Sequence, residues 1–514
     1  MSGKVWLVGA GPGDRGLLTL KGLEVLRAAE VVVYDALVGE EVLTLIPEEA
    51  ELINVGKRAG NHIMVQEDIN RVLLEKAKEG KKVVRLKGGD PFLFGRGGEE
   101  LELLVENDIP YEVVPGVTSA FAVPAYNGIP VTHRDYTSSV HIITGHKRKG
   151  KEYDIDFEAL VRTKGTLIFL MGIAALESIM KGLLRAGIAP DKPAAVLQKG
   201  TTAGQKRVVA TVSTLKDEAD KAGIETPAII VVGDVCGLAE EFFWYEKRPL
   251  AGRRILVTRP KDLQSEMSSR LRKMGAEVME LPAIETVPFA SNPELERCIS
   301  GMFGGAEEER CDWLVFTSPT GVKIFMNAFL TDHDVRDLCR TKIAVIGQGS
   351  AKALSAYGLR ADFIPSIFDG ETLGRELAGR IGGESEGNGR KVRILIPRAA
   401  IGNQELTKEL GSVENAEIYD IATYDTVYTS SPVVDERAYV AGGEIDYAVF
   451  TSASTVRGFA AAMEGIDISN IKAVCIGRQT QAAAQSYGMS TRTAPKATMD
   501  AVAEAVCEAA AQNW

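Results

Sequence analysis

The chain has 514 residues, a length that predicts three or four compact domains at roughly 150 residues each. Hydrophobic residues make up 45% and charged residues 25%, and the six cysteines contain no CxxC pair, which excludes collagen-like, disordered, disulfide-framework and zinc-finger classes. The formal net charge of −11 has the wrong sign for a protein that grips nucleic acid through its phosphates. We therefore expect a globular protein whose partners are small molecules.

The beginning of the chain and its apolar runs bear on location. No apolar run approaches the roughly 20 residues of a membrane helix. The first residues, MSGKVWLVGAGPGD, lead into a strand without a signal-peptide profile. Together with the widely spaced cysteines, this predicts a cytoplasmic protein with free thiols and no membrane partner.

Short β-branched runs alternate with amphipathic stretches along the whole chain, from VWLVGA at residues 5–10 to KAVCIG at 472–477. This alternation predicts an α/β fold with largely parallel sheets. In such sheets ligands bind beyond the carboxyl ends of the strands. The runs here end in Gly, Asp, Thr or Ser, so functional residues are expected at those ends.

Two breaks divide this pattern. The stretch FWYEKRPLAGR at 243–253 separates a first half, residues 1–245, from a second half, residues 250–514. Within the first half, the Pro- and Gly-containing stretch around residues 130–137 predicts a hinge between two lobes.

The second half contains an internal repeat. DWLVFTSPTGVKIF at 312–325 matches DYAVFTSASTVRGF at 446–459, and residues 342–359 match 472–489. The strand at 253–260 similarly matches 392–399. The repeat predicts two related lobes of about 130 residues with a ligand cleft between them.

Two glycine-rich motifs mark strand ends in the first half. GAGPGD at 9–14 has Asp14 where a dinucleotide fingerprint needs glycine, so it is either a plain turn or a close approach to a flat ligand. RLKGGDPFLFGRGGEE at 85–100 indicates a binding site more strongly. Its paired glycines remove side-chain bulk, and Asp90 offers an acceptor for ribose hydroxyls or a cationic group.

A third motif, VPGVTSAFAVPAYNGIPVTHR at 114–134, places Thr118 and Ser119 at the start of an expected helix. Backbone N–H groups at a helix start favour anionic groups. The motif ends in a second turn that carries His133 and Arg134.

In this order over residues 3–245, VGAGPGD, YDALV, VGKR, GGDPFLFGRG, VPGVTS, GIPVTHR, LMG and VVGDV resemble the tetrapyrrole methylases, in particular the uroporphyrinogen-III C-methyltransferases. The resemblance implies two α/β lobes with S-adenosylmethionine between them. It also implies methyl transfer to two pyrrole carbons of uroporphyrinogen III, giving precorrin-2, and a homodimer formed through this half.

The resemblance assigns roles to particular residues. The S-adenosylmethionine site would consist of Pro12, Gly88, Gly89, Asp90, Leu93, Thr118, Ser119, Met171 and Gly200, with core packing as the alternative for Leu93 and Met171. Asp35 of YDALV would accept a proton and Lys57 of VGKR would donate one. The alternatives are a structural role for Asp35 and a bond from Lys57 to a substrate carboxylate.

A substrate with eight carboxylates on a net negative protein requires local basic clusters. Arg58, His133 and Arg134 are therefore expected to bind substrate, and the two arginines are favoured because the guanidinium fork suits carboxylates. The run HKRKGK at 146–151 is either a further cluster or a solvated loop. Basic residues are expected to concentrate in the clefts.

The repeated VFTS and IG elements of the second half end strands with hydroxyl and glycine groups, and neither a Ser, His and acid constellation nor a metal-ligand pattern is visible. Over residues 250–514 these elements resemble uroporphyrinogen-III synthase, a family that closes hydroxymethylbilane with loss of water. The resemblance implies an interleaved chain, with 250–287 and 425–514 in one lobe, 288–424 in the other, and two connecting strands.

Within that resemblance, Tyr424 is the candidate for assisting water loss, with Tyr419 and Tyr428 as rivals. Substrate carboxylates would be bound by Thr317, Ser318, Thr451, Ser452 and Thr480, with Thr480 favoured over Gln479. Simple capping of helices at the strand ends is the alternative for these hydroxyls.

The sequence thus predicts a bifunctional cytoplasmic enzyme without a metal: an S-adenosylmethionine-dependent C-methyltransferase followed by a synthase that makes its substrate, feeding sirohaem and cobalamin. The alternative is a methylase of a later corrinoid intermediate fused to a non-catalytic tetrapyrrole-binding module.

Overall fold

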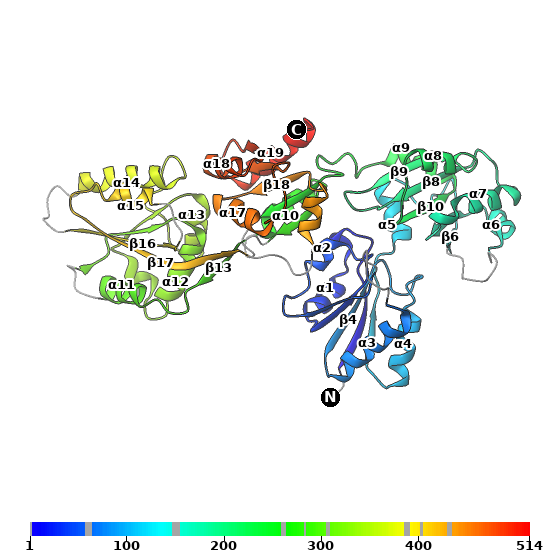
Figure 1. The fold of residues 1–514 in the computed structure, drawn as a ribbon, viewed down its shortest axis with the longest axis horizontal. Coiled ribbons are helices and arrows are strands. Elements are labelled where there is room, and N and C mark those ends of the chain that lie inside the picture. Colours follow the sequence, from blue (N-terminus) through cyan, green and yellow to red (C-terminus); the bar gives the residue numbers. More distant parts are fainter. Residues whose placement is uncertain are drawn as a thin grey trace.

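The computed structural model describes residues 3–56, 64–145, 155–258, 264–281, 284–304, 309–384, 391–400, 404–428 and 434–514. These residues form four five-stranded sheets with helices on their faces, which we call the first to fourth lobes (Figure 1). In Figure 1 the first lobe is blue, the second runs from cyan to green, and the fourth is mainly yellow-green. The third lobe combines green strands with orange and red elements from the end of the chain.

The first lobe has strand order β3-β2-β4-β1-β5, and every pairing is parallel. Its strands are β1 Lys4–Gly9, β2 Val31–Tyr34, β3 Glu51–Asn54, β4 Lys82–Lys87 and β5 Tyr111–Val114. Its helices are α1 Leu20–Arg27, α2 Glu40–Leu43, α3 Gln66–Lys78 and α4 Gly97–Glu106. The parallel direction brings the carboxyl ends of β1, β4 and β5 to one edge.

The second lobe has strand order β6-β7-β10-β8-β9. Its strands are β6 Val140–Thr144, β7 Thr166–Leu170, β8 Pro193–Gln198, β9 Lys206–Thr211 and β10 Ala228–Val232. Its helices are α5 Ser119–Tyr126, α6 Phe157–Thr163, α7 Leu176–Arg185, α8 Leu215–Lys221 and α9 Ala239–Phe242. Only β6 and β7 pair in parallel; the other pairings are antiparallel, so the expectation of a largely parallel sheet is wrong here.

The third lobe has strand order β12-β11-β18-β19-β20 and is entirely parallel. Its strands are β11 Arg254–Thr258, β12 Glu277–Leu281, β18 Tyr447–Phe450, β19 Lys472–Cys475 and β20 Ser490–Thr493. Its helices are α10 Gln264–Lys273, α16 Glu436–Ala441, α17 Ala453–Ala462, α18 Arg478–Ser486 and α19 Met499–Ala511.

The fourth lobe has strand order β13-β17-β16-β14-β15, with only β13 antiparallel to its neighbour. Its strands are β13 Ile284–Pro288, β14 Trp313–Phe316, β15 Lys342–Val345, β16 Val392–Ala399 and β17 Ala416–Tyr428. Its helices are α11 Pro293–Gly304, α12 Pro319–Phe329, α13 Gln348–Ser355, α14 Gly370–Glu384 and α15 Glu405–Leu410.

The repeated segments occupy equivalent places in the strand order of the third and fourth sheets. The run β16-β14-β15 of the fourth lobe has the same order as β11-β18-β19 of the third, and these are the repeated segments. The chain enters the fourth lobe through β13 and leaves it through the end of β17, and these two strands pair with each other. Both connecting strands belong to the fourth sheet, which extends this lobe to residue 428.

Each sheet is buried on both faces. The large buried clusters divide two to a sheet, one on each face, as the alternation of side chains along a strand requires. In β1, for example, Val5 and Leu7 pack with α3 and α4, whereas Val8 packs with α1 and α2. The near-continuous apolar runs of the sequence follow from this double cover.

The hinge between the first two lobes lies earlier than residues 130–137. Ala120, Val123 and Ile129 belong to a core cluster of the second lobe, together with residues of β7, β8 and β10. The chain therefore changes lobe between the end of β5 and the start of α5. The expected position was wrong because Pro124 does not interrupt α5, which continues to Tyr126.

At the carboxyl edge of the first sheet, three backbone segments approach too closely for side chains. A Cβ placed on Gly116 would lie 2.2 Å from the carbonyl oxygen of Gly89, and one on Gly9 would lie 2.5 Å from Gly116. Gly89 also exchanges two backbone hydrogen bonds with Gly11, at 2.8 and 3.2 Å. Close backbone contacts thus join the three strand ends.

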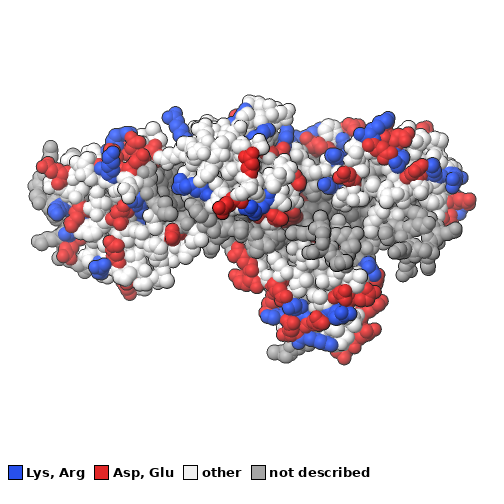
Figure 2. Space-filling view, viewed as in Figure 1, with Lys and Arg blue, Asp and Glu red and all other residues white. Residues whose placement is uncertain are grey.

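Charged side chains are mixed over the surface. On the face shown in Figure 2, acidic and basic residues are interspersed, and they are dense over the first lobe. Among the helices that the structure describes, none is long and apolar enough to cross a membrane.

We predict that Gly116→Ala lowers the free energy of unfolding by about 1–3 kcal/mol, because the new methyl group must displace the backbone of Gly89 or Gly9. Chemical denaturation of the full chain measures this loss. The matched control is Gly98→Ala in α4, where a Cβ meets nothing within 4 Å. An equal loss of stability in both variants would contradict the account of the strand ends.

Candidate functional site

A cavity of about 600 Å³ lies between the first and second lobes. All nine residues expected to bind S-adenosylmethionine line it, and so does Asp35; the nine are Pro12, Gly88, Gly89, Asp90, Leu93, Thr118, Ser119, Met171 and Gly200. The nine residues come from five separate segments of the chain, and Asp35 comes from a sixth. The volume lies within the range of small-molecule sites, roughly 300–1,000 Å³.

Glycines shape the walls of this cavity. A Cβ on Gly88 would lie 2.7 Å from the Cβ of Leu37, and one on Gly200 would lie 2.4 Å from a methyl group of Val123. Gly89 differs, because a Cβ there would meet nothing within 4 Å, and its φ of +69° favours glycine. Gly88 and Gly200 therefore allow neighbouring wall residues to pack closely, whereas Gly89 leaves open space beside its backbone.

The Asp90 carboxylate holds the loop that follows β4. Its Oδ1 accepts from the backbone N–H of Phe92 at 2.8 Å, and its Oδ2 accepts from the N–H of Gly116 at 3.0 Å. Asp90 thus joins the β4 loop to the segment that leads into α5. Any bond from Asp90 to a ligand would use lone pairs that these backbone contacts leave available.

Several residues around the cavity have backbone conformations that side chains rarely adopt. Phe94, Arg96, Met171 and Lys199 line it with φ values of 55°, 58°, 55° and 43°. Such conformations persist where the surrounding structure imposes them, and they cluster at functional sites. Met171 is also 52% exposed, so it is a wall residue and not a core residue.

Asp35 lies at the end of β2, where its carboxylate is fixed on two sides. Its Oδ1 accepts from the N–H of Leu37 at 3.1 Å, and its Oδ2 lies 3.4 Å from Nη2 of Arg85. The Asp35 side chain is 26% exposed, whereas that of Arg85 is 3% exposed. The Asp35 carboxylate therefore lies at the cavity, and the buried guanidinium of Arg85 holds it in position.

Behind Asp35, strand β4 carries two buried cations that share one buried acid. Glu100 of α4 is fully buried, and its Oε1 accepts from Arg85 Nε at 3.1 Å and from Lys87 Nζ at 2.6 Å. Burial, together with the nearby Arg85 guanidinium, lowers the pKa of Lys87. Arg85 and Lys87 both line the cavity, so the buried Glu100 binds two cations of the cavity wall.

Sequence reasoning assigned no role to these two cations. A signal was available, because Arg85 and Lys87 interrupt the apolar strand VVRLK, and charged side chains inside a buried strand need a partner. With Arg96 and Lys199 they give the cavity four cationic side chains, against the acids Asp35 and Asp90. The lining of this cavity therefore contains more cationic than acidic side chains.

Of the residues that the sequence predicts to bind substrate carboxylates in the first half, those that the structure describes lie outside the cavity lining. Lys57, Arg58 and the run at 146–151 lie outside the described residues. His133 and Arg134 do not line the cavity. His133 accepts from the N–H of Asp135 at 3.2 Å and packs edge-on against Tyr136, while Arg134 is exposed.

In the second half, Tyr424 and Ser318 meet across the fourth sheet. The Tyr424 hydroxyl and Ser318 Oγ lie 2.8 Å apart, and Tyr424 is 6% exposed. Burial raises the pKa of Tyr424, and the hydrogen bond with Ser318 offsets part of that rise. The phenol is therefore protonated over the ordinary pH range and is able to donate. Of its rivals, Tyr419 interacts with Glu417 and Arg393, and the Tyr428 side chain lies outside the described residues.

Equivalent hydroxyls of the two repeats cap equivalent helices. Ser318 caps α12 through the N–H of Gly321 at 2.9 Å, and Ser452 caps α17 through the N–H of Thr455 at 3.2 Å. Thr317 and Thr451 precede these caps and are partly exposed. Both serines therefore cap helices, and each hydroxyl also has a second partner: Tyr424 for Ser318, and Ser454 for Ser452, both at 2.8 Å.

Thr480 does not have the exposure expected of a substrate contact. It is 4% exposed as the third residue of α18, whereas Arg478 and Gln479 are exposed. The helix turns residue 480 toward the core, which makes Gln479 the more accessible side chain, and the preference for Thr480 over Gln479 stays a prediction.

Two family models match the chain, one in each half. The model for tetrapyrrole (corrin/porphyrin) methylases matches residues 4–216, and the model for uroporphyrinogen-III synthase HemD matches residues 265–504. The matches follow one another without overlap, and the boundary between them falls between the second and third lobes.

Curated relatives and solved structures are similar to one half or to the whole chain. A porphyrin biosynthesis protein HemD of Ruminiclostridium josui is 46% identical over 512 residues and covers 99% of both chains. An S-adenosyl-L-methionine-dependent uroporphyrinogen III methyltransferase of Methanosarcina barkeri is 54% identical over 237 residues, 46% of this chain and 93% of that protein. A crystal structure of uroporphyrin-III C-methyl transferase from Thermus thermophilus complexed with S-adenyl homocysteine is 42% identical, covers 45% of this chain and 98% of that chain, and has a TM-score of 0.40.

The full-length relative has both halves in one polypeptide, as this chain does. The chain therefore belongs to the tetrapyrrole methylase family through its first half and to the uroporphyrinogen-III synthase family through its second half, and it is a bifunctional enzyme of tetrapyrrole biosynthesis.

Proposed function

We propose that the second half closes hydroxymethylbilane to uroporphyrinogen III with loss of water, and that the first half methylates this product at two pyrrole carbons to give precorrin-2. One observation carries the proposal: six distant segments bring all nine expected cofactor residues, and Asp35, to one cavity. The full-length similarity to a porphyrin biosynthesis protein supports the pairing of the two activities.

The cavity fits S-adenosylmethionine as methyl donor. Leu93, Leu197 and Ile229 provide an apolar wall for the adenine, and Gly89 leaves open space beside a backbone turn. The N-terminal end of α5, capped by Thr118, favours a carboxylate group. When bound there, the sulfonium group supplies an electrophilic methyl group.

Within this proposal, the residues of the first half mainly position the reactants. After the carbon–carbon bond forms, the macrocycle loses a proton at a position other than the methylated carbon, and Asp35 accepts it. Arg85 holds the Asp35 carboxylate in place. Lys57 donates a proton or pairs with a substrate carboxylate. Arg58, Arg96, His133 and Arg134 bind the other carboxylates of a substrate that reaches beyond the cavity.

For ring closure, we propose that Tyr424 assists the departure of hydroxide from the hydroxymethyl carbon by donating its phenolic proton. Ser318 orients that hydroxyl at 2.8 Å. The hydroxyls of Thr317, Thr451, Ser452 and Thr480 bind carboxylates from the two facing lobes, with the exposed Gln479 as the alternative to the buried Thr480. Folding of the linear chain, and not acid strength, then provides most of the catalysis.

Three further properties belong to the proposal. The protein works in a reducing cytosol, which agrees with its six free cysteines, four of them buried. It forms a homodimer through the first half, as the resemblance to tetrapyrrole methylases implies. Its product feeds sirohaem and cobalamin.

A coupled assay tests the function: the full chain is incubated with hydroxymethylbilane and S-adenosylmethionine, and the products are separated by mass and isomer type. We expect the dimethylated type III product. Closure to the type I isomer alone would contradict the synthase, and unmethylated type III product would contradict the methyltransferase.

We predict that Asp35→Asn lowers the methylation rate by about 10²–10⁴, because the amide keeps the bond from Leu37 but cannot accept a proton. Ring closure should not change, and both rates are measured on the same preparation. The matched control is Asp156→Asn, where the side chain caps α6 and asparagine caps equally well. Loss of both activities in Asp35→Asn would argue against separate sites.

We predict that Tyr424→Phe lowers the ring-closure rate by about 10–100-fold, because only the donated proton is lost. Tyr419→Phe is the control and should retain most of the rate.

Since burial raises the pKa of Tyr424 above its ordinary value of 10.0, the donor stays protonated below that pH. The ring-closure rate of the unmodified chain should therefore show no decrease due to this group below about pH 10, and an alkaline decrease near pH 8 that Tyr424→Phe abolishes would contradict the assignment.

A further inference from the structure

The first and third lobes are joined by buried, charged contacts. Helix α2 lies directly below the third lobe in Figure 1. Oε1 of Glu41 accepts from Nε of Arg272 at 2.6 Å and from the backbone N–H of Val278 at 3.1 Å. The Glu41 side chain is 11% exposed and that of Arg272 is 18% exposed, so the pair is largely removed from water.

The contact is directional as well as charged. Nη1 of Arg272 binds Glu280 at 3.1 Å and Nη2 binds the carbonyl oxygen of Val278 at 3.3 Å, which orients the guanidinium toward Glu41. Next to it, Glu40 accepts from the hydroxyl of Tyr439 at 2.5 Å. Burial raises the pKa of Glu41, and Arg272 opposes this rise, as expected for a carboxylate that depends on its partner to stay ionised.

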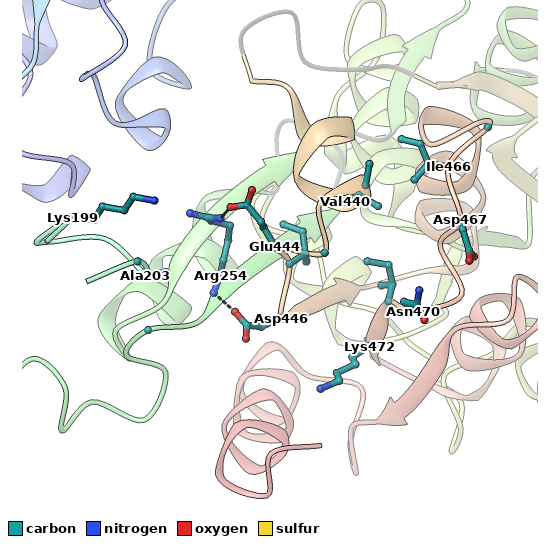
Figure 3. A pocket seen from close by; sticks show the side chains of 17 residues that line it. Lys199, Ala203, Arg254, Val440, Glu444, Asp446, Ile466, Asp467, Asn470 and Lys472 are labelled. Atoms are coloured by element: carbon teal, nitrogen blue, oxygen red, sulfur yellow. Dashed lines mark hydrogen bonds and ion pairs between the residues drawn. The ribbon is translucent and has the colours of Figure 1, made fainter. Parts of the chain in front are cut away.

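A second contact joins the second and third lobes. The N–H of Ala203 donates to Oε2 of Glu277 at 2.7 Å, and Oε1 of Glu277 accepts from Arg254 at 3.0 Å. Beside this contact is an open crevice of about 840 Å³. Figure 3 shows Lys199 and Ala203 on the second-lobe side of the crevice, facing Arg254 on the other side.

Both contacts hold segments that continue into the methylase cavity. Helix α2 follows directly on residues 35–39, of which Asp35 and Leu37 line the cavity and Leu37 packs against Gly88. Ala203 follows Lys199 and Gly200, which also line it. The two segments meet the same turn, since a Cβ on Gly13 would lie 2.8 Å from Thr202 and one on Gly39 would lie 2.4 Å from the carbonyl oxygen of Gly13.

We propose that Arg272 and Glu277 of the synthase half are positioning residues for methyl transfer: they fix α2 and the loop at 199–205, and thereby two walls of the cavity in the methylase half. The proposal rests on the proposed binding of S-adenosylmethionine in that cavity. By thermodynamic linkage, a ligand that orders these walls also strengthens the contact between the halves.

The experiment measures methylation of uroporphyrinogen III by the full chain, so that ring closure is bypassed. In Arg272→Met, we expect KM for S-adenosylmethionine and Kd for S-adenosylhomocysteine, measured by calorimetry, to rise by about tenfold. Arg272→Lys should recover part of the affinity, because it keeps the charge and loses the fork. Ring closure should stay within about twofold of the unmodified rate.

A double-mutant cycle with Glu41→Gln separates coupling from general damage. We expect Glu41→Gln to raise the Kd for S-adenosylhomocysteine as well. The Glu41→Gln/Arg272→Met double variant should have a Kd no higher than that of the single variant with the higher Kd. The matched control is Arg393→Met, which removes a partner of Glu417 at 3.1 Å in the fourth lobe and should leave methylation unchanged.

The outcomes are distinguishable from failure of the proposed function. If the unmodified chain neither binds S-adenosylhomocysteine nor methylates, the proposed function is wrong. If it does both, and Glu41→Gln and Arg272→Met keep its KM and Kd, the positioning role is wrong. If Arg272→Met does not fold, the Kd of the near-isosteric Glu41→Gln variant decides between these results.

Discussion

The structure of the methylase half depends on the approach of three backbone segments at the carboxyl edge of one parallel sheet. Gly9, Gly89 and Gly116 come so close that a single methyl group on Gly116 would lie 2.2 Å from a carbonyl oxygen. This contact sets the positions of the three loops that follow β1, β4 and β5. The turn with Pro12, the turn with Asp90 and the start of α5 at Thr118 therefore line one cavity. The second lobe supplies the other wall through Met171 and Gly200.

The charge of the molecule is arranged around that cavity. A chain with a net charge of −11 directs four cationic side chains into the cavity and holds two of them from behind with the buried Glu100. Burying cations inside strand β4 requires such a partner, because an unpaired buried charge costs several kcal/mol. The net charge is therefore compatible with a polyanionic substrate.

Much of this arrangement could be predicted from the sequence where local chemistry demands particular residues. Paired glycines with Asp90 indicated the cavity, and the repeated VFTS elements indicated two related lobes. The antiparallel pairings of the second lobe could not be predicted, because short apolar runs such as TLIFL and AIIVV carry no information on strand direction. The burial of Thr480 could not be predicted either, because a one-residue difference in helix phase decides between core and surface. The pair Glu41 and Arg272 is 231 residues apart in the sequence, and each residue alone has the pattern of an ordinary surface charge.

The two halves meet at the amino ends of the third sheet, whereas the hydroxyls of Thr451 and Ser452 follow the carboxyl end of β18. Arg254, Glu277 and Lys472, at the interface or its crevice, all begin strands. The contact between the halves thus leaves the synthase hydroxyls at the opposite edge of that sheet.

The central claim is that the cavity between the first two lobes holds the methyl donor. A crystal structure of the full chain with S-adenosylhomocysteine tests it most directly. The account predicts the ligand against Gly88, Gly89 and Met171, with its reactive end toward Asp35. Ordered ligand anywhere else, with this cavity filled only by solvent, would contradict it.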